Sequence, residues 1–194
     1  LSTALAWFFT STRLDAVVTP SIVCAPFRVM ATVVATAQGD LIAGIDESGV
    51  SDIAGPLVAA CVVLPKILDV QKDDLRIFEV GDSKQVPESK RRELAKIIWQ
   101  MAIAIGIGEV TAAEYDYLGP HQSTRIAMFR AVLACRSVEK SKPTRPDFLL
   151  VDQAQDIRVP IAIPQKSLAK GDGKSLAIAS ASISGSSPRT SSVT

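Results

Sequence analysis

Two apolar runs of this chain end in acidic residues, and this pattern limits the fold more than any other feature. Residues 41–45 lead directly into Asp46 and Glu47, and residues 148–151 lead into Asp152. Short apolar runs bounded by charged residues or glycine are typical of buried strands. If both strands end at the same edge of one sheet, their carboxylates meet there. Because Mg²⁺ prefers oxygen ligands, the pattern predicts a site for divalent metal ions.

Each acidic residue also has a simpler interpretation. A strand often ends in Asp because that side chain starts a turn. Adjacent strand residues point to opposite faces of a sheet, so Asp46 and Glu47 share a metal site only if the strand bends where it ends. Gly49 allows such a bend.

Hydrophobic periodicity predicts strands that give way to alternating helices and strands. Strands are expected at 42–46, 57–64, 103–109 and 148–152, and helices from Pro87-Glu88, from the capping-box pair Thr111 and Glu114, over 122–140 and over 175–183. The 122–140 helix is expected to carry Ile126, Phe129 and Leu133 on one apolar stripe. The first two strands should form an antiparallel hairpin with the acids at its turn. The order predicts an α/β domain with a mixed sheet flanked by helices.

Composition is compatible with one core in a chain of 194 residues. The formal net charge of +1 provides no global field for nucleic acid, so binding would depend on local patches. Cys24, Cys61 and Cys135 are widely spaced among apolar neighbours. They are expected to be reduced core thiols in a cytoplasm-like compartment.

The two ends of the chain differ in composition from its middle. Pro20, Pro26 and Arg28 interrupt the apolar N-terminal stretch well before the length of a membrane span, and no basic segment precedes it as in a secretory signal. We expect residues 1–40 to be a disordered extension or upstream read-through, with a true start near Met30; a transit peptide is the alternative. Residues 184–194 are rich in Ser, Gly and Thr and are expected to be a disordered tail.

Seven segments between these ends resemble, in order, the type 2 ribonucleases H, ribonuclease HII above all. They are GIDESG at 44–49, AGPLVAACVVLP at 54–65, DSK at 82–84, GIGEVTAAEYDYL at 106–118, QSTRIAMFRA at 122–131, FLLVD at 148–152 and KGDGKSLAIASASI at 170–183. The resemblance covers roughly 41–183, which we take as the catalytic domain. It implies the ribonuclease H-like fold.

The resemblance also implies a reaction and a metal site. In this family two Mg²⁺ or Mn²⁺ ions serve the cleavage of RNA paired with DNA, leaving a 5′-phosphate and a 3′-hydroxyl. Asp46, Glu47 and Asp152 match three of the four carboxylates. The fourth is expected beyond the last helix, but no carboxylate follows Ile183. We therefore expect a domain that is incomplete at its C-terminus.

Substrate contacts are also implied by the resemblance. Gly49, Val50 and Ser51 stand where ribonuclease HII has Gly-Arg-Gly, and Asp52 resembles ribonuclease HIII. Their backbone amides are candidates for contact with a 2′-hydroxyl. Phosphate contacts are expected from Ser83, Lys84, Lys170, Lys174, Ser180 and Ser182. The simpler alternative is a turn at Ser83 and solvated lysines on a helix.

Two classes of function remain from the sequence. The first is a metal-dependent endonuclease specific for RNA–DNA hybrids, acting as a cytoplasmic monomer without membrane contact. The second is a truncated, weakly active or inactive relative that only binds duplex nucleic acid.

Overall fold

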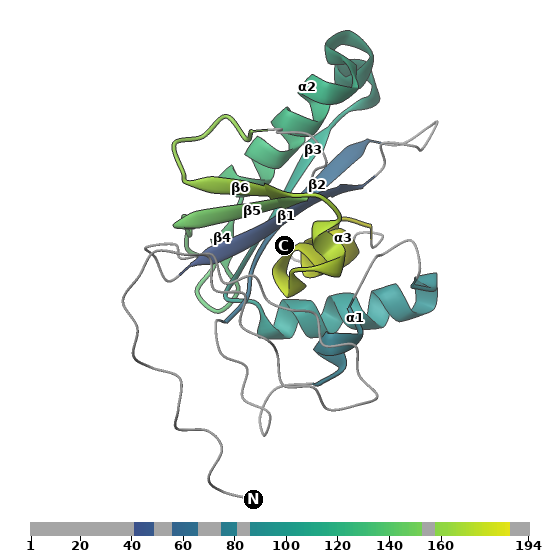
Figure 1. Ribbon diagram of the computed structural model, residues 1–194, viewed down its shortest axis with the longest axis vertical. Coiled ribbons are helices and arrows are strands. Elements are labelled where there is room, and N and C mark those ends of the chain that lie inside the picture. The colour runs from purple at the N-terminus through teal and green to yellow at the C-terminus, as the bar shows by residue number, and fades with distance from the viewer. Residues whose placement is uncertain (1–40, 49–55, 66–74, 81–85, 153–157, 187–194) are drawn as a thin grey trace, which may run out of the picture.

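Six strands form one mixed sheet in the computed structural model, which describes residues 41–48, 56–65, 75–80, 86–152 and 158–186 (Figure 1). The sheet order is β4-β3-β2-β1-β5-β6. The strands are β1 (Ile42–Ser48), β2 (Leu57–Val63), β3 (Ala104–Val110), β4 (Arg136–Ser137), β5 (Phe148–Asp152) and β6 (Gln165–Leu168). From β1 to β4 neighbouring strands are antiparallel, whereas β1, β5 and β6 run parallel. The expected mixed α/β sheet is confirmed.

The opening hairpin places its acids differently from the prediction. β1 and β2 are antiparallel as expected, but Asp46 pairs with Ala60 and Glu47 with Ala59, and pairing continues to Ser48. The prediction that the acids lie at the turn is therefore wrong. Backbone groups make the ladder whatever the side chains are, so an apolar run does not mark where pairing ends.

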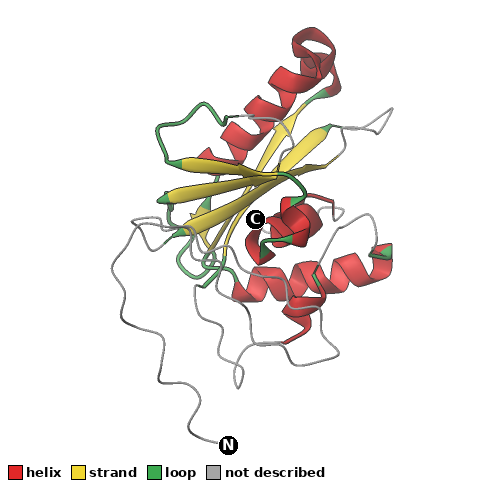
Figure 2. Ribbon diagram, in the orientation of Figure 1, coloured by secondary structure: helices red, strands yellow, loops and turns green. Residues whose placement is uncertain are grey.

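In the described part of the chain, three helices cover the two faces of the sheet. They are α1 (Glu88–Met101), α2 (Ala112–Leu133) and α3 (Leu176–Ser186), with short 3-10 helices η1 (Leu75–Glu79) and η2 (Gly171–Gly173). One core cluster joins α2 to one face, and a second joins α1 and α3 to the other. Figures 1 and 2 show α3 between the sheet and α1.

The α2 helix begins as predicted but ends early. Thr111 and Glu114 form the capping box, and Gly119, with a φ of 75°, marks a kink between two helical parts. The second part ends at Leu133 rather than near Lys140, because Arg136 then pairs with β3 in the short strand β4. Tertiary pairing overrides local helix preference here.

The predicted apolar stripe of α2 is confirmed in part, since Ile126 and Phe129 pack against the core cluster but Leu133 does not. Leu133 is 61% exposed, and Ile126 and Phe129 are only partly buried. The buried residues include Ala127 and Ala131 instead. A Cβ at Gly106 of β3 would lie 2.1 Å from the carbonyl oxygen of Ala131, and a Cβ at Gly108 would lie 2.2 Å from that of Ala127. The helix backbone therefore rests directly on the strand, which leaves room only for small side chains at the contact.

The remaining predictions about the ends and the thiols have mixed outcomes. Residues 184–186 belong to α3, so the tail does not begin at 184, while residues 1–40 and 187–194 lie outside the described residues. Cys61 and Cys135 are free and buried as expected, and Cys24 is outside the described part. In the described ranges, no helix has the length and apolarity needed to cross a membrane.

Candidate active site

Asp46 and Asp152 lie at matching positions of two neighbouring parallel strands, and Asp152 is the last residue of β5. Ile45 of β1 pairs with Val151 of β5, so the next residue in each strand is an aspartate. Ile45 and Val151 both belong to the core under α2. Because side chains alternate along a strand, both aspartates face α3, on strands about 4.8 Å apart. The structure thus brings together two acids separated by most of the domain.

Asp46 is held in a buried, polar environment. Its side chain is 9% exposed, its Oδ1 accepts the Glu47 backbone N–H at 2.8 Å, and it hydrogen-bonds the side chain of Ser182. Burial, and then the charges of Glu47 and Asp152, raise the pKa of Asp46 to about 8, against the opposing effect of its hydrogen bonds. Without a nearby cation, Asp46 therefore keeps its proton at neutral pH.

The close approach of α3 to β1 explains the contact with Ser182. A Cβ at Gly44 would lie 2.1 Å from the carbonyl carbon of Ala177. Gly44 and Asp46 share a face of β1, since they are two residues apart. The missing side chain at Gly44 lets α3 sit on the strand, and this brings Ser182 to the carboxyl group.

Asp152 anchors the turn that precedes α3. Its Oδ1 accepts the backbone N–H of Gly171 at 2.9 Å, and its Oδ2 accepts that of Asp172 at 3.4 Å. Burial raises the pKa of Asp152, the charge of Asp172 raises it further, and the Gly171 amide and the charge of Lys174 oppose the rise. The acid therefore connects the end of β5 to a turn that carries both acidic and basic residues.

Glu47 does not join the two aspartates. It pairs with Ala59, which lies in the core under α2, so it points to the opposite face from Asp46. Among the described residues, no group of three or more His, Cys, Asp or Glu side chains is arranged to hold a metal ion. The expected gathering of Asp46, Glu47 and Asp152 is thus not found. The reason is that β1 stays paired and unbent through Ser48; Gly49 lies outside the described residues.

Asp172 is a further acid at this place, and sequence reasoning passed over it. The resemblance predicts a fourth carboxylate after Ile183, whereas Asp172 precedes the last helix and lies beside Asp152. A signal was present in the sequence, because Asp172 stands between Gly171 and Gly173 in a turn just before the last helix. Turns of this kind project polar side chains at the end of a sheet.

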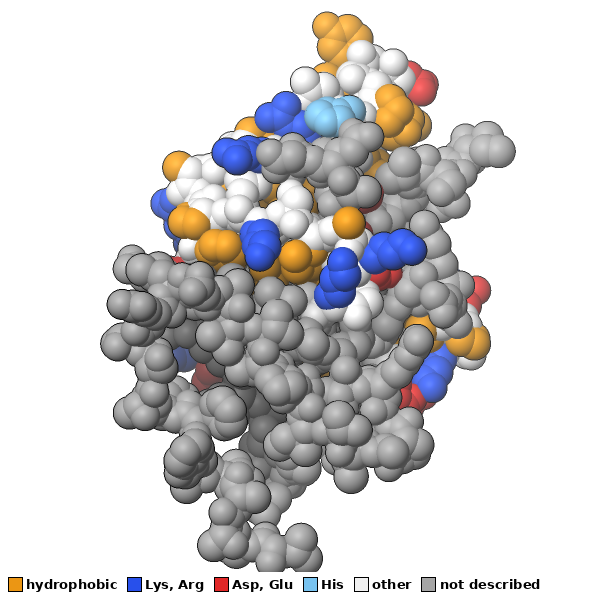
Figure 3. Space-filling view, viewed as in Figure 1, with side chains coloured by type: hydrophobic (Ala, Val, Ile, Leu, Met, Phe, Trp, Pro, Cys, Tyr) orange, Lys and Arg blue, Asp and Glu red, His pale blue; other side chains and the backbone are white. Residues whose placement is uncertain are grey.

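The predicted phosphate contacts fall into three groups. Lys170 and Lys174 are exposed at η2, where the Lys174 Nζ donates to the Ala169 carbonyl at 2.5 Å. On the face seen in Figure 3, basic side chains lie next to acidic ones. Ser180 and Ser182 are buried in α3, which corrects their assignment, since neither hydroxyl is presented to a duplex. Ser83 and Lys84 lie outside the described residues, as do Gly49, Val50 and Ser51, which were predicted to contact a 2′-hydroxyl.

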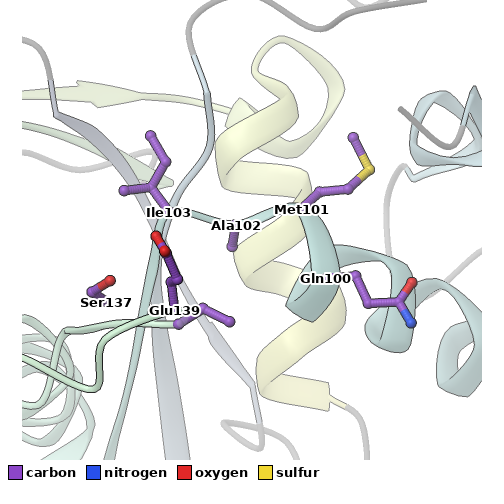
Figure 4. A pocket seen from close by; sticks show the side chains of 7 residues that line it. Gln100, Met101, Ala102, Ile103, Ser137 and Glu139 are labelled. Carbon is purple, nitrogen blue, oxygen red and sulfur yellow. The ribbon is translucent and has the colours of Figure 1, made fainter. Parts of the chain in front are cut away.

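A separate hollow lies toward the other end of the sheet. It has a volume of about 380 Å³ and is lined by Gln100, Met101, Ala102, Ile103, Ser137, Val138 and Glu139 (Figure 4). Ile103 is hydrogen-bonded to Val63, which pairs with the start of β1 rather than with Asp46. Glu139 is its one carboxylate, so the hollow lacks the paired acids found beside α3.

Comparison with known proteins shows that the fold is a known one. The ribonuclease H2 of Pyrococcus horikoshii OT3 superposes with a TM-score of 0.58 at 22% identity, over 75% of this chain and 70% of that one. The Bst-RNase HIII structure in complex with Mn²⁺ has a TM-score of 0.51 at 19% identity, over 76% and 51%. These similarities establish the ribonuclease H-like fold.

Two curated proteins are more similar in sequence to this chain than these solved structures are. The Ribonuclease HII of Geobacillus sp. (strain WCH70) is 44% identical over 144 residues, which are 74% of this chain and 46% of that protein. The chain spans about half the length of the curated relatives it matches. The family model for Ribonuclease HII matches residues 43–189. On these grounds, the chain belongs to the ribonuclease HII family.

Proposed function

We propose that this chain is a metal-dependent endonuclease that cuts the RNA strand of RNA–DNA hybrids and leaves a 5′-phosphate and a 3′-hydroxyl. The observation that carries the proposal is the matched register of Asp46 and Asp152, which sets two partly desolvated carboxylates side by side on one face. Membership of the ribonuclease HII family supports it.

The donor chemistry of this site suits a hard divalent cation. Asp46 and Asp152 offer oxygen ligands, and the raised pKa of each shows that its negative charge is poorly compensated. Asp172 is the nearest further donor, while Glu47 would join only if the end of β1 changed course. Bound Mg²⁺ or Mn²⁺ would activate the attacking water and stabilise the leaving 3′ oxygen.

The surrounding residues have distinct roles in this proposal. Ser182 orients the Asp46 carboxyl through their hydrogen bond. Asp152 holds the turn through Gly171 and so fixes where Lys170 and Lys174 stand. Both lysines are exposed beside the acids, where they suit contact with backbone phosphates. This arrangement would hold a duplex against the carboxylates.

We further propose that the protein acts as a monomer in the cytoplasm on nucleic acid and not on membranes. The free, buried thiols Cys61 and Cys135 support a reducing compartment.

The test is cleavage of a fluorescent RNA–DNA hybrid in Mg²⁺ or Mn²⁺, with binding measured separately by anisotropy. Asp46→Asn and Asp152→Asn should reduce cleavage by on the order of 100-fold or more while binding is retained. Asp116→Asn, a matched change of an exposed carboxyl on α2, should leave both unchanged. Equal cleavage in a chelator, or by the Asp46 variant, would refute the proposal.

A second candidate function is binding of the hybrid without cleavage. It is favoured by the lack of a three-acid metal group among the described residues. In that case the unmodified chain binds hybrid but shows no metal-dependent cleavage at any tested concentration. The Asp172→Asn variant tests the metal site separately. It should weaken cleavage only if the Asp172 carboxylate is a ligand of the metal ion.

A further inference from the structure

Two buried thiols face each other on the side of the sheet opposite Asp46 and Asp152. Cys61 lies in the middle of β2, and Cys135 follows the last turn of α2. Their exposed fractions are 0% and 1%, and both belong to the core cluster under α2. They come from segments far apart in the sequence, so the fold alone brings them together.

The backbone geometry places the two thiols within reach of a disulfide. Cys61 pairs with Gly106 of β3, and a Cβ at Gly106 would lie 2.7 Å from the Cα of Cys135. Cys135 therefore sits directly over the residue beside Cys61. With paired Cα atoms about 5 Å apart, the Cα atoms of the two cysteines are separated by roughly 5 to 7 Å, the range that disulfides span.

The side chains themselves are in contact. The thiols of Cys61 and Cys135 form a hydrogen bond, which together with burial raises the pKa of Cys61. The same bond lowers the pKa of Cys135, while burial opposes that change. The contact therefore favours loss of a proton from one thiol of the pair.

The surroundings of the pair also favour Cys135 as the first thiol to react. Its chain neighbours Ala134 and Arg136 are exposed, as is Leu133 at the end of α2. A water-sized oxidant needs only a local opening of this helix end to reach Cys135, whereas Cys61 lies in the centre of the sheet. No described His, Asp or Glu joins the two thiols in a group that could hold a metal ion.

We propose that Cys61 and Cys135 are an oxidisable dithiol that hydrogen peroxide converts into a disulfide joining β2 to the C-terminal end of α2. The Cys135 sulfur attacks one peroxide oxygen; an S–O bond forms, the O–O bond breaks, and the leaving hydroxide takes the thiol proton as water. The Cys61 sulfur then attacks Cys135; the S–S bond forms, the S–O bond breaks, and a second water leaves with the Cys61 proton. Two thiols are oxidised and one peroxide is reduced to two waters.

The experiment uses the full chain with Cys24→Ser, so that only this pair can react. The folded protein is treated with hydrogen peroxide, remaining thiols are blocked with N-ethylmaleimide in urea, and the digest is analysed by mass spectrometry without reductant. The expected product is a cross-linked peptide pair containing Cys61 and Cys135 that dithiothreitol separates. The oxidised protein should also unfold at a temperature higher by roughly 5 °C or more, because the cross-link closes a long loop.

Two single variants in the same background test the order of reaction. Cys61→Ala leaves Cys135 without a partner, so a sulfenic acid should accumulate there and be trapped by dimedone. Cys135→Ala should give no such adduct at Cys61. Recovery of both cysteines as maleimide adducts after peroxide treatment, or overoxidation of Cys135 with Cys61 unchanged, would overturn the proposal. The cross-linking measurement needs neither variant, so it decides the matter even if an alanine variant does not fold.

Discussion

The two faces of the sheet are closed by helices of different character. Under α2 the core is almost entirely apolar, and the helix backbone rests on β3 at Gly106 and Gly108. Under α3 the helix is buried along nearly its whole length, yet it carries the buried hydroxyls of Ser180, Ser182 and Ser184. Both contacts rely on glycine, and α2 also buries the hydroxyls of Ser123 and Thr124. The α3 face differs because its buried Ser182 hydrogen-bonds a buried carboxyl group.

The α3 face is where burial of carboxyl groups costs the folded protein electrostatic free energy. A buried carboxyl is unfavourable as an ion unless hydrogen bonds or a cation compensate it. Asp46 and Asp152 both lie on the α3 face, where Ser182 and the Gly171 amide provide partial compensation. Under α2 the described buried residues are aliphatic side chains, two thiols and the hydroxyls of Ser123 and Thr124, with no buried carboxyl group among them. The α3 face is therefore suited to chemistry, and the α2 face contributes mainly to the stability of the fold.

The largest expected effect is a pH dependence of stability caused by Asp46. Because its pKa is raised to about 8 from 3.8, the folded protein keeps a proton that the unfolded chain loses between these values. The contribution of Asp46 to the free energy of unfolding is therefore fully present below about pH 4 and is lost as pH rises to about 8, by up to ~1.4 kcal/mol per pH unit. Asp46→Asn should flatten this slope in urea unfolding measured with chelator.

Asp116→Asn is the matched control for this measurement and should retain the slope. A smaller slope of the same sign remains in the Asp46 variant, because burial also raises the pKa of Asp152. A variant whose stability still falls as steeply as that of the unmodified chain would show that the α3 face is not electrostatically strained.

The second prediction compares the glycine contacts of the two faces. Gly44→Ala would place its Cβ 2.1 Å from the Ala177 carbonyl carbon, and Gly106→Ala 2.1 Å from the Ala131 oxygen. Since backbone atoms cannot move aside as side chains do, each should lower the free energy of unfolding by about 3 kcal/mol or more. Gly173→Ala meets nothing within 4 Å and should change it little. Urea midpoints measure all three.

The positions that the sequence predicted correctly are those with a local signal. The start of α1 at Glu88 and the capping box at Thr111 each depend on residues close in the chain. The parallel register of β1 with β5 then follows from a sheet built of apolar strands. Local patterns suffice here because neighbouring residues supply the capping and the periodicity.

The positions that the sequence missed depend on distant residues. The buried face of α2 is set by Gly106 and Gly108 on a strand, and no periodicity within the helix reveals that. β4 and β6 are short and polar, so their pairing comes from backbone groups alone. Asp172 was overlooked because its proximity to Asp152 arises from the turn that Asp152 itself anchors.

The third prediction separates two serines of the same helix. Ser182 hydrogen-bonds Asp46, whereas the buried Ser180 hydroxyl has no hydrogen-bond partner within the described part of the chain. Ser182→Ala should cost ~1 to 2 kcal/mol by removing that bond, and Ser180→Ala should be neutral or slightly stabilising because it removes an unsatisfied buried group. Thermal unfolding of the two alanine variants side by side tests this. Equal losses would mean that α3 is sensitive at any position, irrespective of its hydrogen bonds.

The smallest expected effect concerns how the two covering helices begin. At α2, the Thr111 hydroxyl accepts the Glu114 backbone N–H at 3.2 Å, and the Glu114 carboxylate accepts the Thr111 N–H at 2.9 Å. At α3, the corresponding bond from the Ile178 N–H to Ser175 Oγ is 3.5 Å long. Thr111→Ala should therefore lower the free energy of unfolding by about 1 kcal/mol. Ser175→Ala should lose less than half as much, since a bond of that length contributes little.

Urea unfolding at pH 6 measures this pair of cap variants, with Ser89→Ala on the exposed surface of α1 as the reference for replacing a hydroxyl. If Ser175→Ala proves the more damaging change, the start of α3 is held by its hydroxyl after all. The helix would then depend on its cap rather than on burial, and the contrast between a locally capped α2 and a packing-held α3 would fail.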